Sequence, residues 1–466
     1  MGLITARKLL SSRGAGLACV AVSYLYLISL PGQSKSALLW LTNFLIIALS
    51  CGLVYFDSRN AISLKKVSGI FVLLFFGIAP ILEYKMKIQY WGGGEISDND
   101  YIFVNILILI AMTLYFVVYR ISFSIQRSNY LRAGDQALLN AANSRLRFLR
   151  LLPPVVVSLL VILWFNDFNF LNLLLRGGDL RGDSVLENKT VGLIVNNFLR
   201  PFCFSALILC VFVARQYFRS NIIWCLVFGP IALLACFPTA IARFAIAALY
   251  IPLILVLYPG ILKRGFLAVN GLVVSFVTIF PFFDAFRNFG QKSSVEYFAF
   301  GFDFFAAGHF DAYQNFVRTV SLDIVTGGNQ LLGALLFFIP RTMWSQKPLG
   351  SGELLASKAN LALTNIAQSL PAEGYINFGV FGIFAFVAFA AYCSAAIDRR
   401  FWREEMALRS STFSLHYFQL IGLAIFIWRG DLLNAIAYTS GFLFSMALAC
   451  HIYKSKPIRL YRAANR

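Results

Sequence analysis

The stretch YIFVNILILIAMTLYFVVY, residues 101–119, decides the fold of this chain. It contains no charged side chain. A helix rises about 1.5 Å per residue, so a segment of this length covers the roughly 30 Å of hydrocarbon in a bilayer. The stretch therefore predicts a transmembrane helix.

Eleven more apolar segments have the same character, and each predicts a helix that crosses the membrane. They cover residues 14–30, 37–56, 67–82, 151–165, 191–214, 222–238, 244–259, 265–286, 376–397, 413–428 and 432–450. Several are short, so we expect one or two to be tilted, broken or partly re-entrant. No repeat or low-complexity tract divides the chain, so the sequence predicts one all-α polytopic domain over residues 1–466, with about twelve transmembrane helices.

The composition agrees with a membrane protein. Hydrophobic residues make up 59% of the chain and charged residues 13%, which is too little charge to cover a soluble protein of 466 residues. The net charge of +19 does not indicate a nucleic-acid partner, because the basic residues lie in short runs between apolar segments. The eight cysteines fall in or beside these segments without a CxxC pair, which is typical of small apolar residues rather than metal ligands.

The positions of Lys and Arg predict the orientation. With a cytoplasmic N-terminus, 25 of the 40 Lys and Arg residues lie in segments on the cytoplasmic side. Every short connection follows the positive-inside rule, so we expect both termini in the cytoplasm. The basic start, with Arg7, Lys8 and Arg13, is also compatible with a cleaved signal peptide, but the next apolar segment follows at once and favours a first membrane helix.

Two segments outside the predicted spans stand out. Residues 120–150 place leucines at helical spacing with arginines between them, which predicts an amphipathic helix on the anionic cytoplasmic leaflet; a binding site for a partner is the alternative. Residues 287–371 form an outer loop of some 85 residues, too long for a simple connection and too aromatic for disorder. Within it, Gln330–Ile339 is apolar but too short to span, so we expect it along the outer interface.

The outer side gathers ionisable residues that membrane folding alone does not require. Arg243 lies in a tight connection between two spans, and His309 is the only histidine that this topology places on the outer side. The other members are Asp284, Arg287, Asp303, Asp311, Arg318, Arg341, Lys347, Glu373, Arg429 and Asp431. Charges at a membrane boundary are costly unless paired or functional, so the set predicts either a site or a group of ion pairs that tie loops together.

Two sequence blocks resemble a known family. Residues 338–348, FIPRTMWSQKP, resemble the Pro-Arg-x-x-Trp-x-x-Lys-Pro signature of bacterial oligosaccharide repeat-unit (O-antigen, Wzy-type) polymerases. Residues 373–382, EGYINFGVFG, are similar to their Glu-x-Tyr-x-Asn-Phe-Gly-x-x-Gly motif at the start of a late span. The segment 303–313, the lone Arg243 and the large late loop also fit, whereas the first outer loops are unusually short.

The resemblance implies a GT-C-like glycosyltransferase of the bacterial inner membrane, active on its periplasmic side. Such an enzyme polymerises repeat units linked to undecaprenyl diphosphate, which serve as both donor and acceptor, into O-antigen or a related surface polysaccharide. It requires no metal, nucleotide sugar or other cofactor. Membrane lipid and a chain-length regulator protein are the further partners that the resemblance suggests.

That reaction assigns roles to the outer residues. The diphosphate leaving group needs fixed cations, for which Arg341, Arg243 and Arg287 come first and Lys347 and Arg429 next. The acceptor hydroxyl needs a base, and Glu373 is preferred over Asp311 and His309 because the end of a span holds it rigidly. The aromatic rings of Tyr313, Trp344 and Tyr375 are candidates for sugar contacts, and Asp303 completes the predicted substrate-binding set.

Two other functions remain open from the sequence. An O-antigen ligase shares the donor chemistry and differs only in its acceptor. A flippase or transporter of lipid-linked oligosaccharide predicts charged residues near the middle of the membrane, whereas here they gather at the outer ends of spans, apart from Arg200.

Overall fold

The apolar segments form helices in the computed structural model of the chain, which describes residues 2–32, 35–56, 60–125, 144–175, 189–216, 221–285, 302–405 and 412–455. No β-strand occurs in these ranges. Each of the twelve predicted segments coincides with one helix or with consecutive helical pieces. The prediction of an all-α membrane protein is therefore confirmed.

The helices of the bundle follow one another through the chain. They are α1 (Gly2–Ser29), α2 (Ala37–Tyr55), α3 (Leu64–Phe71) with η1 (Val72–Ile78) and α4 (Ala79–Met86), α5 (Asp98–Ile125), α7 (Ser144–Phe165), α10 (Lys189–Ile194) with η4 (Val195–Leu199) and α11 (Arg200–Gln216), α12 (Ile222–Ala235), α13 (Arg243–Leu257), α14 (Gly265–Ala285), α18 (Leu370–Arg399) with η9 (Arg400–Glu405), α20 (Phe413–Arg429) and α21 (Leu432–Lys454). Short connecting helices are η2 (Tyr90–Gly92), α8 (Phe170–Leu174) and η6 (Pro259–Lys263).

Among the described residues, seven helices are long and apolar enough to cross a membrane. They cover Ala37–Tyr55, Leu64–Met86, Asp98–Ser124, Leu146–Phe165, Val191–Arg215, Leu370–Trp402 and Leu432–Lys454. Five shorter apolar helices, of 10–17 residues, occupy the remaining predicted segments.

The helix from Leu64 to Met86 forms the centre of one half of the bundle and is buried from Leu64 to Tyr84. Its middle turns, η1, widen into a π-helix, a geometry that leaves backbone groups without their usual partners. The amide of Asn43 on α2 donates to the Gly77 carbonyl at 3.0 Å, and this bond fixes α2 against the widened turn. A Cβ on Gly77 would lie 2.7 Å from Ile47, so the glycine permits the close approach.

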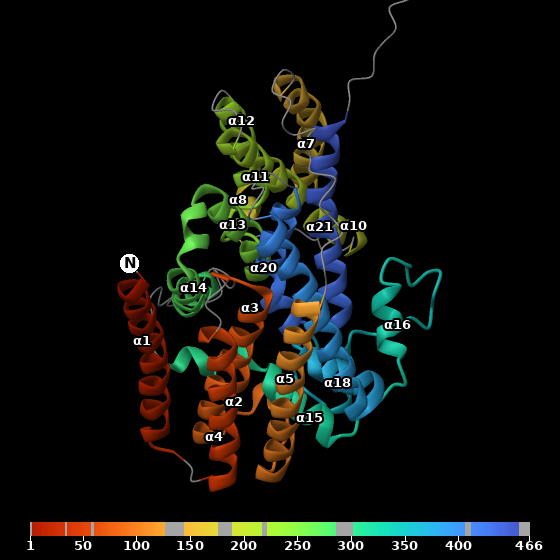
Figure 1. Cartoon of the computed structure of the whole chain (residues 1–466). Helices are drawn as coiled ribbons and strands as arrows, with labels where there is room; N and C mark the ends of the chain where they lie inside the picture. Colours follow the sequence, from red (N-terminus) through yellow and green to blue (C-terminus); the bar gives the residue numbers. More distant parts are fainter. Residues whose placement is uncertain are drawn as a thin grey trace, which may run out of the picture.

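Two groups of helices build the bundle, each around its own core (Figure 1). The first contains α2, the α3–α4 helix, α5 and α18, and the second contains α7, α11, α12, α13, α20 and α21. Helix α20 also packs on α3 and α18, so it connects the two groups.

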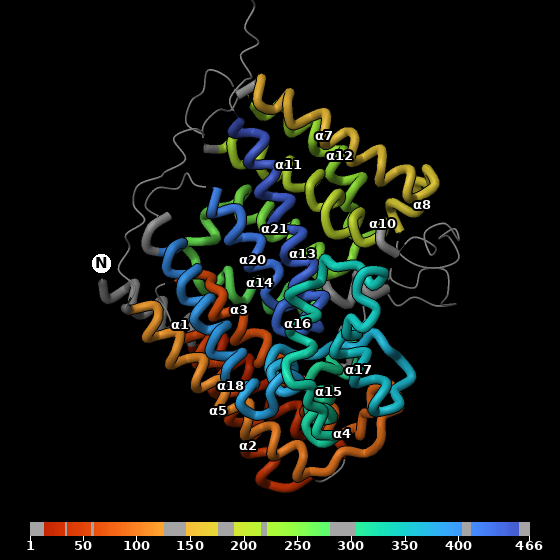
Figure 2. The backbone as a smooth tube through the Cα atoms, turned by 90° about the vertical axis from the view of Figure 1, so that its right-hand side faces the viewer, coloured from red at the N-terminus to blue at the C-terminus, as the bar shows by residue number. Residues whose placement is uncertain are grey.

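The predicted outer loop is largely folded. Residues 302–369 form η7 (Phe302–Ala306), η8 (Gly308–Phe310), α15 (Ala312–Ser321), α16 (Asn329–Leu335) and α17 (Ser351–Lys358). Helix α15 packs against α5, α17 and α18, and Figure 2 shows α15 and α17 at the end of the bundle where α4 finishes. We call this the loop end, and we call the end where α2 and α5 finish the opposite end.

The apolar stretch Gln330–Ile339 forms α16 and the turns after it, and it exposes Leu332, Leu335 and Phe338. The predicted amphipathic segment 120–150 is described only at its two ends, which continue α5 and begin α7. Residues 126–143 lie outside the described residues.

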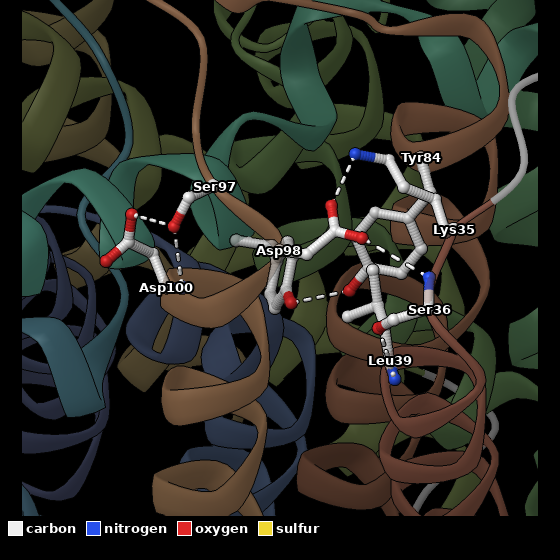
Figure 3. A network of polar contacts seen from close by, with 8 residues as sticks. Lys35, Ser36, Leu39, Tyr84, Ser97, Asp98 and Asp100 are labelled. Carbon is white, nitrogen blue, oxygen red and sulfur yellow. Dashed lines mark hydrogen bonds and ion pairs between the residues drawn. The ribbon is translucent and has the colours of Figure 1, made fainter.

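The first short loop is held by an ion pair. Lys35 Nζ lies 2.6 Å from Asp98 Oδ1, and the Ser36 amide donates to Asp98 Oδ2 at 3.3 Å, which ties the start of α2 to the start of α5 (Figure 3). The pair therefore connects the loop before α2 to the start of α5, 63 positions further along the chain.

Candidate functional site

The turn between α20 and α21 is the meeting point of the predicted outer residues. Its side chains Arg429 and Asp431 contact residues from two other segments of the chain, 309–311 and the start of α17. We define the turn cluster as Arg429, Asp431, Asp311, Glu373 and Ser351.

Asp311 and Arg429 form the ion pair at one side of the turn cluster. Arg429 Nη2 lies 3.1 Å from Asp311 Oδ1, and Arg429 Nε donates to the His309 carbonyl at 2.8 Å. Asp311 Oδ2 accepts from the Trp91 indole at 2.9 Å and from the Ala367 amide at 3.3 Å. The Asp311 side chain is 1% exposed and that of Arg429 is 29% exposed, so the pair fixes the loop and leaves part of the guanidinium accessible.

Glu373 holds the other side of the turn. Its Oε2 accepts from the Ser351 hydroxyl at 2.7 Å and its Oε1 from the Leu432 amide at 2.8 Å. Its side chain is fully buried. The carboxylate preferred from the sequence as the base thus has both oxygens engaged in joining α17, α18 and α21.

Asp431 caps the N-terminus of α21. Its Oδ1 accepts from the Leu433 and Asn434 amides, and its Oδ2 accepts from the Gly352 amide at 3.1 Å. Burial raises the pKa of Asp431 above its ordinary value, although these backbone donors act in the opposite direction.

The motif at the start of α18 shapes the backbone. Gly379 adopts φ 62° and ψ −150°, a conformation open to glycine alone, and the helix kinks there. A Cβ on Gly382 would lie 1.9 Å from the Gly374 carbonyl oxygen, so the two turns pass too closely for a side chain. Tyr375 donates to Asp323 at 2.7 Å, and Asn377 accepts from the Leu331 amide at 2.7 Å. The motif therefore positions Glu373 and anchors α16.

The cations of the Pro340–Pro348 block bind their own loop. Arg341 donates to the carbonyls of Lys347 at 2.6 Å and Pro348 at 3.0 Å, while Lys347 Nζ donates to the carbonyls of Phe337 and Ile339. Burial, followed by the Arg341 charge, lowers the pKa of Lys347. Trp344 is half-buried in the same loop. The closed loop leads directly to Ser351, and so to the turn cluster.

Arg243 lies apart from the turn cluster, at the first position of α13. Beside it is a cavity of about 120 Å³ between α11, α13 and α21, which is lined by Arg200, Asn196 and Tyr438 together with the turn Ala240–Ala242. Arg200 is 6% exposed. The buried Arg200 therefore lines the cavity, and Arg243 lies between two other lining residues, Ala242 and Phe244.

An aromatic layer joins this cavity to the turn cluster. Phe244, next to Arg243, stacks on Phe426 at 4.1 Å between ring centroids and meets Tyr438 edge-on at 4.7 Å. Phe426 precedes Arg429 by one helical turn. The cavity and the turn cluster are therefore neighbours across one layer of rings.

His309 differs in exposure from the two carboxylates. Its side chain is only half-buried, and its ring contacts Phe304 and Phe310 with centroid distances of 4.7 Å for each. Among the three acid–base candidates it is the least buried residue, although its Nε2 atom is shielded from solvent.

Two predicted residues cannot be placed. Arg287 lies outside the described residues, as does the side chain of Asp303. Tyr313 is fully buried and donates to Asn105 at 2.7 Å, so it is a core residue rather than a sugar platform.

The sequence did not point to Ser351 or Trp91, because each joins the turn cluster only through a tertiary contact. Arg200 was visible as an arginine inside an apolar segment, which is the signal that could have identified it. Within the described residues, no group of three or more His, Cys, Asp or Glu side chains is placed to hold a metal ion.

Comparisons with protein-family models, with curated proteins and with solved structures find no match to this chain.

Proposed function

We propose that this protein is a bacterial inner-membrane glycosyltransferase of GT-C-like architecture, which polymerises undecaprenyl-diphosphate-linked repeat units into O-antigen or a related polysaccharide. The observation that carries the proposal is the cavity that buries Arg200 beside Arg243, one aromatic layer from the turn cluster. The two sequence blocks at 338–348 and 373–382 support the choice of reaction.

In this proposal all twelve apolar helices cross the membrane. The five shorter helices cross it together with the seven long ones. The segments rich in Lys and Arg favour a cytoplasmic position for the opposite end. The loop end then faces the periplasm, where lipid-linked repeat units are available.

The cations act on the leaving group. As the bond between the anomeric carbon and the phosphate oxygen breaks, negative charge grows on undecaprenyl diphosphate. A guanidinium fixed in a low-dielectric cavity stabilises that charge without having to reorganise. We assign this role to Arg200 and Arg243, with Arg429 as the partly exposed cation nearest the acceptor side.

The acceptor hydroxyl is activated by a base. Its oxygen forms the new bond to the anomeric carbon while its proton passes to the base, a contribution of typically 10²–10⁴-fold in rate. We assign this role to His309, since Glu373 and Asp311 are buried and committed to protein donors. Arg429 holds the His309 backbone and so positions the imidazole.

Deletion of the gene in its own host, with the surface polysaccharide resolved by size on a gel, tests the proposal. A polymerase predicts core carrying a single repeat unit. Bare core with long polymer retained on undecaprenyl diphosphate would identify a ligase instead, and bare core without periplasmic polymer would identify a flippase.

Complementation with Arg243→Ala tests the site itself. We expect this variant to be present in the membrane and to leave the size ladder unrestored. Arg215→Ala is the matched control, because Arg215 is also on this group of helices but bonds the Val256 carbonyl at the opposite end. Full restoration by Arg243→Ala would exclude this arginine from the site.

A further inference from the structure

A second cavity lies at the opposite end of the bundle, far along the helices from the turn cluster. It has a volume of about 410 Å³ and is formed where α2 ends, α3 begins and α5 ends. All three helices belong to candidate spans whose ends lie here, so the cavity sits at the boundary of the apolar region.

The lining combines cations with aromatic rings. Among the described residues that line it, Lys65 and Arg120 are basic and none is acidic. Lys65 is 5% exposed, and its ammonium lies 5.2 Å from the centre of the Tyr119 ring. Arg120 is exposed at the rim of the cavity.

Among the described residues, Asp398 is an acid close to the start of α3 and accepts from four donors. Asp398 accepts from the backbone amides of Leu64 and Lys65 and from the hydroxyls of Tyr119 and Tyr417. Its charge therefore caps the start of α3. The neighbouring Lys66 does not line the cavity and donates to the Asn60 and Ala61 carbonyls.

Apart from Asn60 and Tyr119, the rest of the described lining is apolar. Phe56 is 71% exposed at the end of α2, and Phe116 and Phe123 are half-buried along α5. A ligand held here needs an anionic group for Lys65 and Arg120 and an apolar part beside these rings.

We propose that this cavity binds the phosphate headgroup of an anionic membrane lipid, with Lys65 and Arg120 on the phosphate and the phenylalanines beside the acyl chains. Cationic pockets between membrane helices at the cytoplasmic side are suited to such headgroups. A free phosphate ion offers the same charge without the apolar part. The site is independent of the reaction proposed above.

Binding of phosphatidylglycerol to the purified full chain, followed by native mass spectrometry in a neutral detergent, tests this site. Arg120→Gln is the main variant because its side chain is exposed, and we expect it to weaken lipid binding about tenfold, the loss of one charge-assisted contact. Lys65→Gln should do the same, provided that it elutes as a folded protein on size exclusion.

Arg147→Gln is the matched control. Arg147 lies on α7 and also covers a tyrosine ring, that of Tyr453 at 5.6 Å, but it does not line the cavity. Equal binding of phosphatidylglycerol by the original chain and Arg120→Gln would overturn the proposal. Displacement of the lipid by millimolar inorganic phosphate would also overturn it, because the site would then recognise soluble phosphate.

Discussion

At the scale of single residues, the three acid–base candidates differ in what they already contact. Glu373 and Asp311 are buried, with each carboxylate oxygen accepting hydrogen bonds from the protein, whereas His309 is half-buried. The sequence favoured Glu373 because the end of a span is rigid. In the structure this rigidity comes from the hydrogen bonds of Ser351 and Leu432 to Glu373, and these bonds occupy both of its carboxylate oxygens.

Substitution by glutamine distinguishes a residue that holds the fold from a residue that acts as the base. We expect Glu373→Gln to keep the polysaccharide ladder but to unfold more easily, by about 1–3 kcal/mol, because one donor loses its acceptor. We expect His309→Gln to lose the ladder while the variant remains folded in the membrane. His416→Gln is the control, since His416 bonds the Thr412 carbonyl at 2.9 Å far from the turn cluster. A folded but inactive Glu373→Gln would instead make Glu373 the base.

Asp431 predicts a dependence of stability on pH. Burial raises its pKa in the folded protein, so the folded state binds this proton more tightly than the unfolded state, whose value is about 3.9. Stability contributed by this group therefore falls as the pH rises from about 4 through the folded pKa. Relative to Asp431→Asn, the original chain should lose melting temperature over that rise in detergent. Parallel pH profiles of the two proteins would contradict the assignment.

At the scale of elements, the hydrophobic pattern predicted the helices and the motifs predicted where the chain becomes irregular. All twelve apolar segments are helical, and seven of these helices are long and apolar enough to cross a membrane, where backbone groups are satisfied only within a helix. The predicted first residue of a helix was less accurate than its presence. Helix α18 begins at Leu370 rather than 376, because its first two turns, before the kink at Gly379, are polar enough to resemble a loop.

Gly379 is the residue on which that kink depends. Gly379→Ala should destabilise the protein by roughly 1–3 kcal/mol, since only glycine adopts this backbone conformation without strain. Gly271→Ala on α14 is the control, because a Cβ there meets nothing within 4 Å and alanine favours the helix. Thermal unfolding of the two variants in the same detergent gives the comparison, and equal melting temperatures would show that the kink is dispensable.

At the scale of the whole molecule, two polar junctions join the two groups of helices. The turn cluster connects them at the loop end, and Asp398 connects α3, α5, α18 and α20 at the opposite end. Neither junction was predictable, because its partners are far apart in sequence: Trp91 and Asp311 are separated by 220 positions, and Tyr119 and Asp398 by 279. Hydropathy predicts which segments enter the membrane, but it does not predict which helices pack against one another.

Asp398→Ala should therefore be among the most destabilising single changes, with a cost of about 3 kcal/mol or more, since four buried donors lose their acceptor. Asp98→Ala removes the half-exposed pair with Lys35 and should cost at most about 1 kcal/mol. Thermal unfolding of both variants measures the difference. Similar melting temperatures would show that Asp398 does not hold the two groups together.

The most direct test of the central claim is reconstitution of the purified chain in vesicles with lipid-linked repeat unit extracted from the host that lacks the gene. We predict a ladder of longer glycans that remain on undecaprenyl diphosphate, formed without added nucleotide sugar and lost in Arg243→Ala and His309→Gln. Repeat units that stay single in the presence of the folded protein would contradict the account.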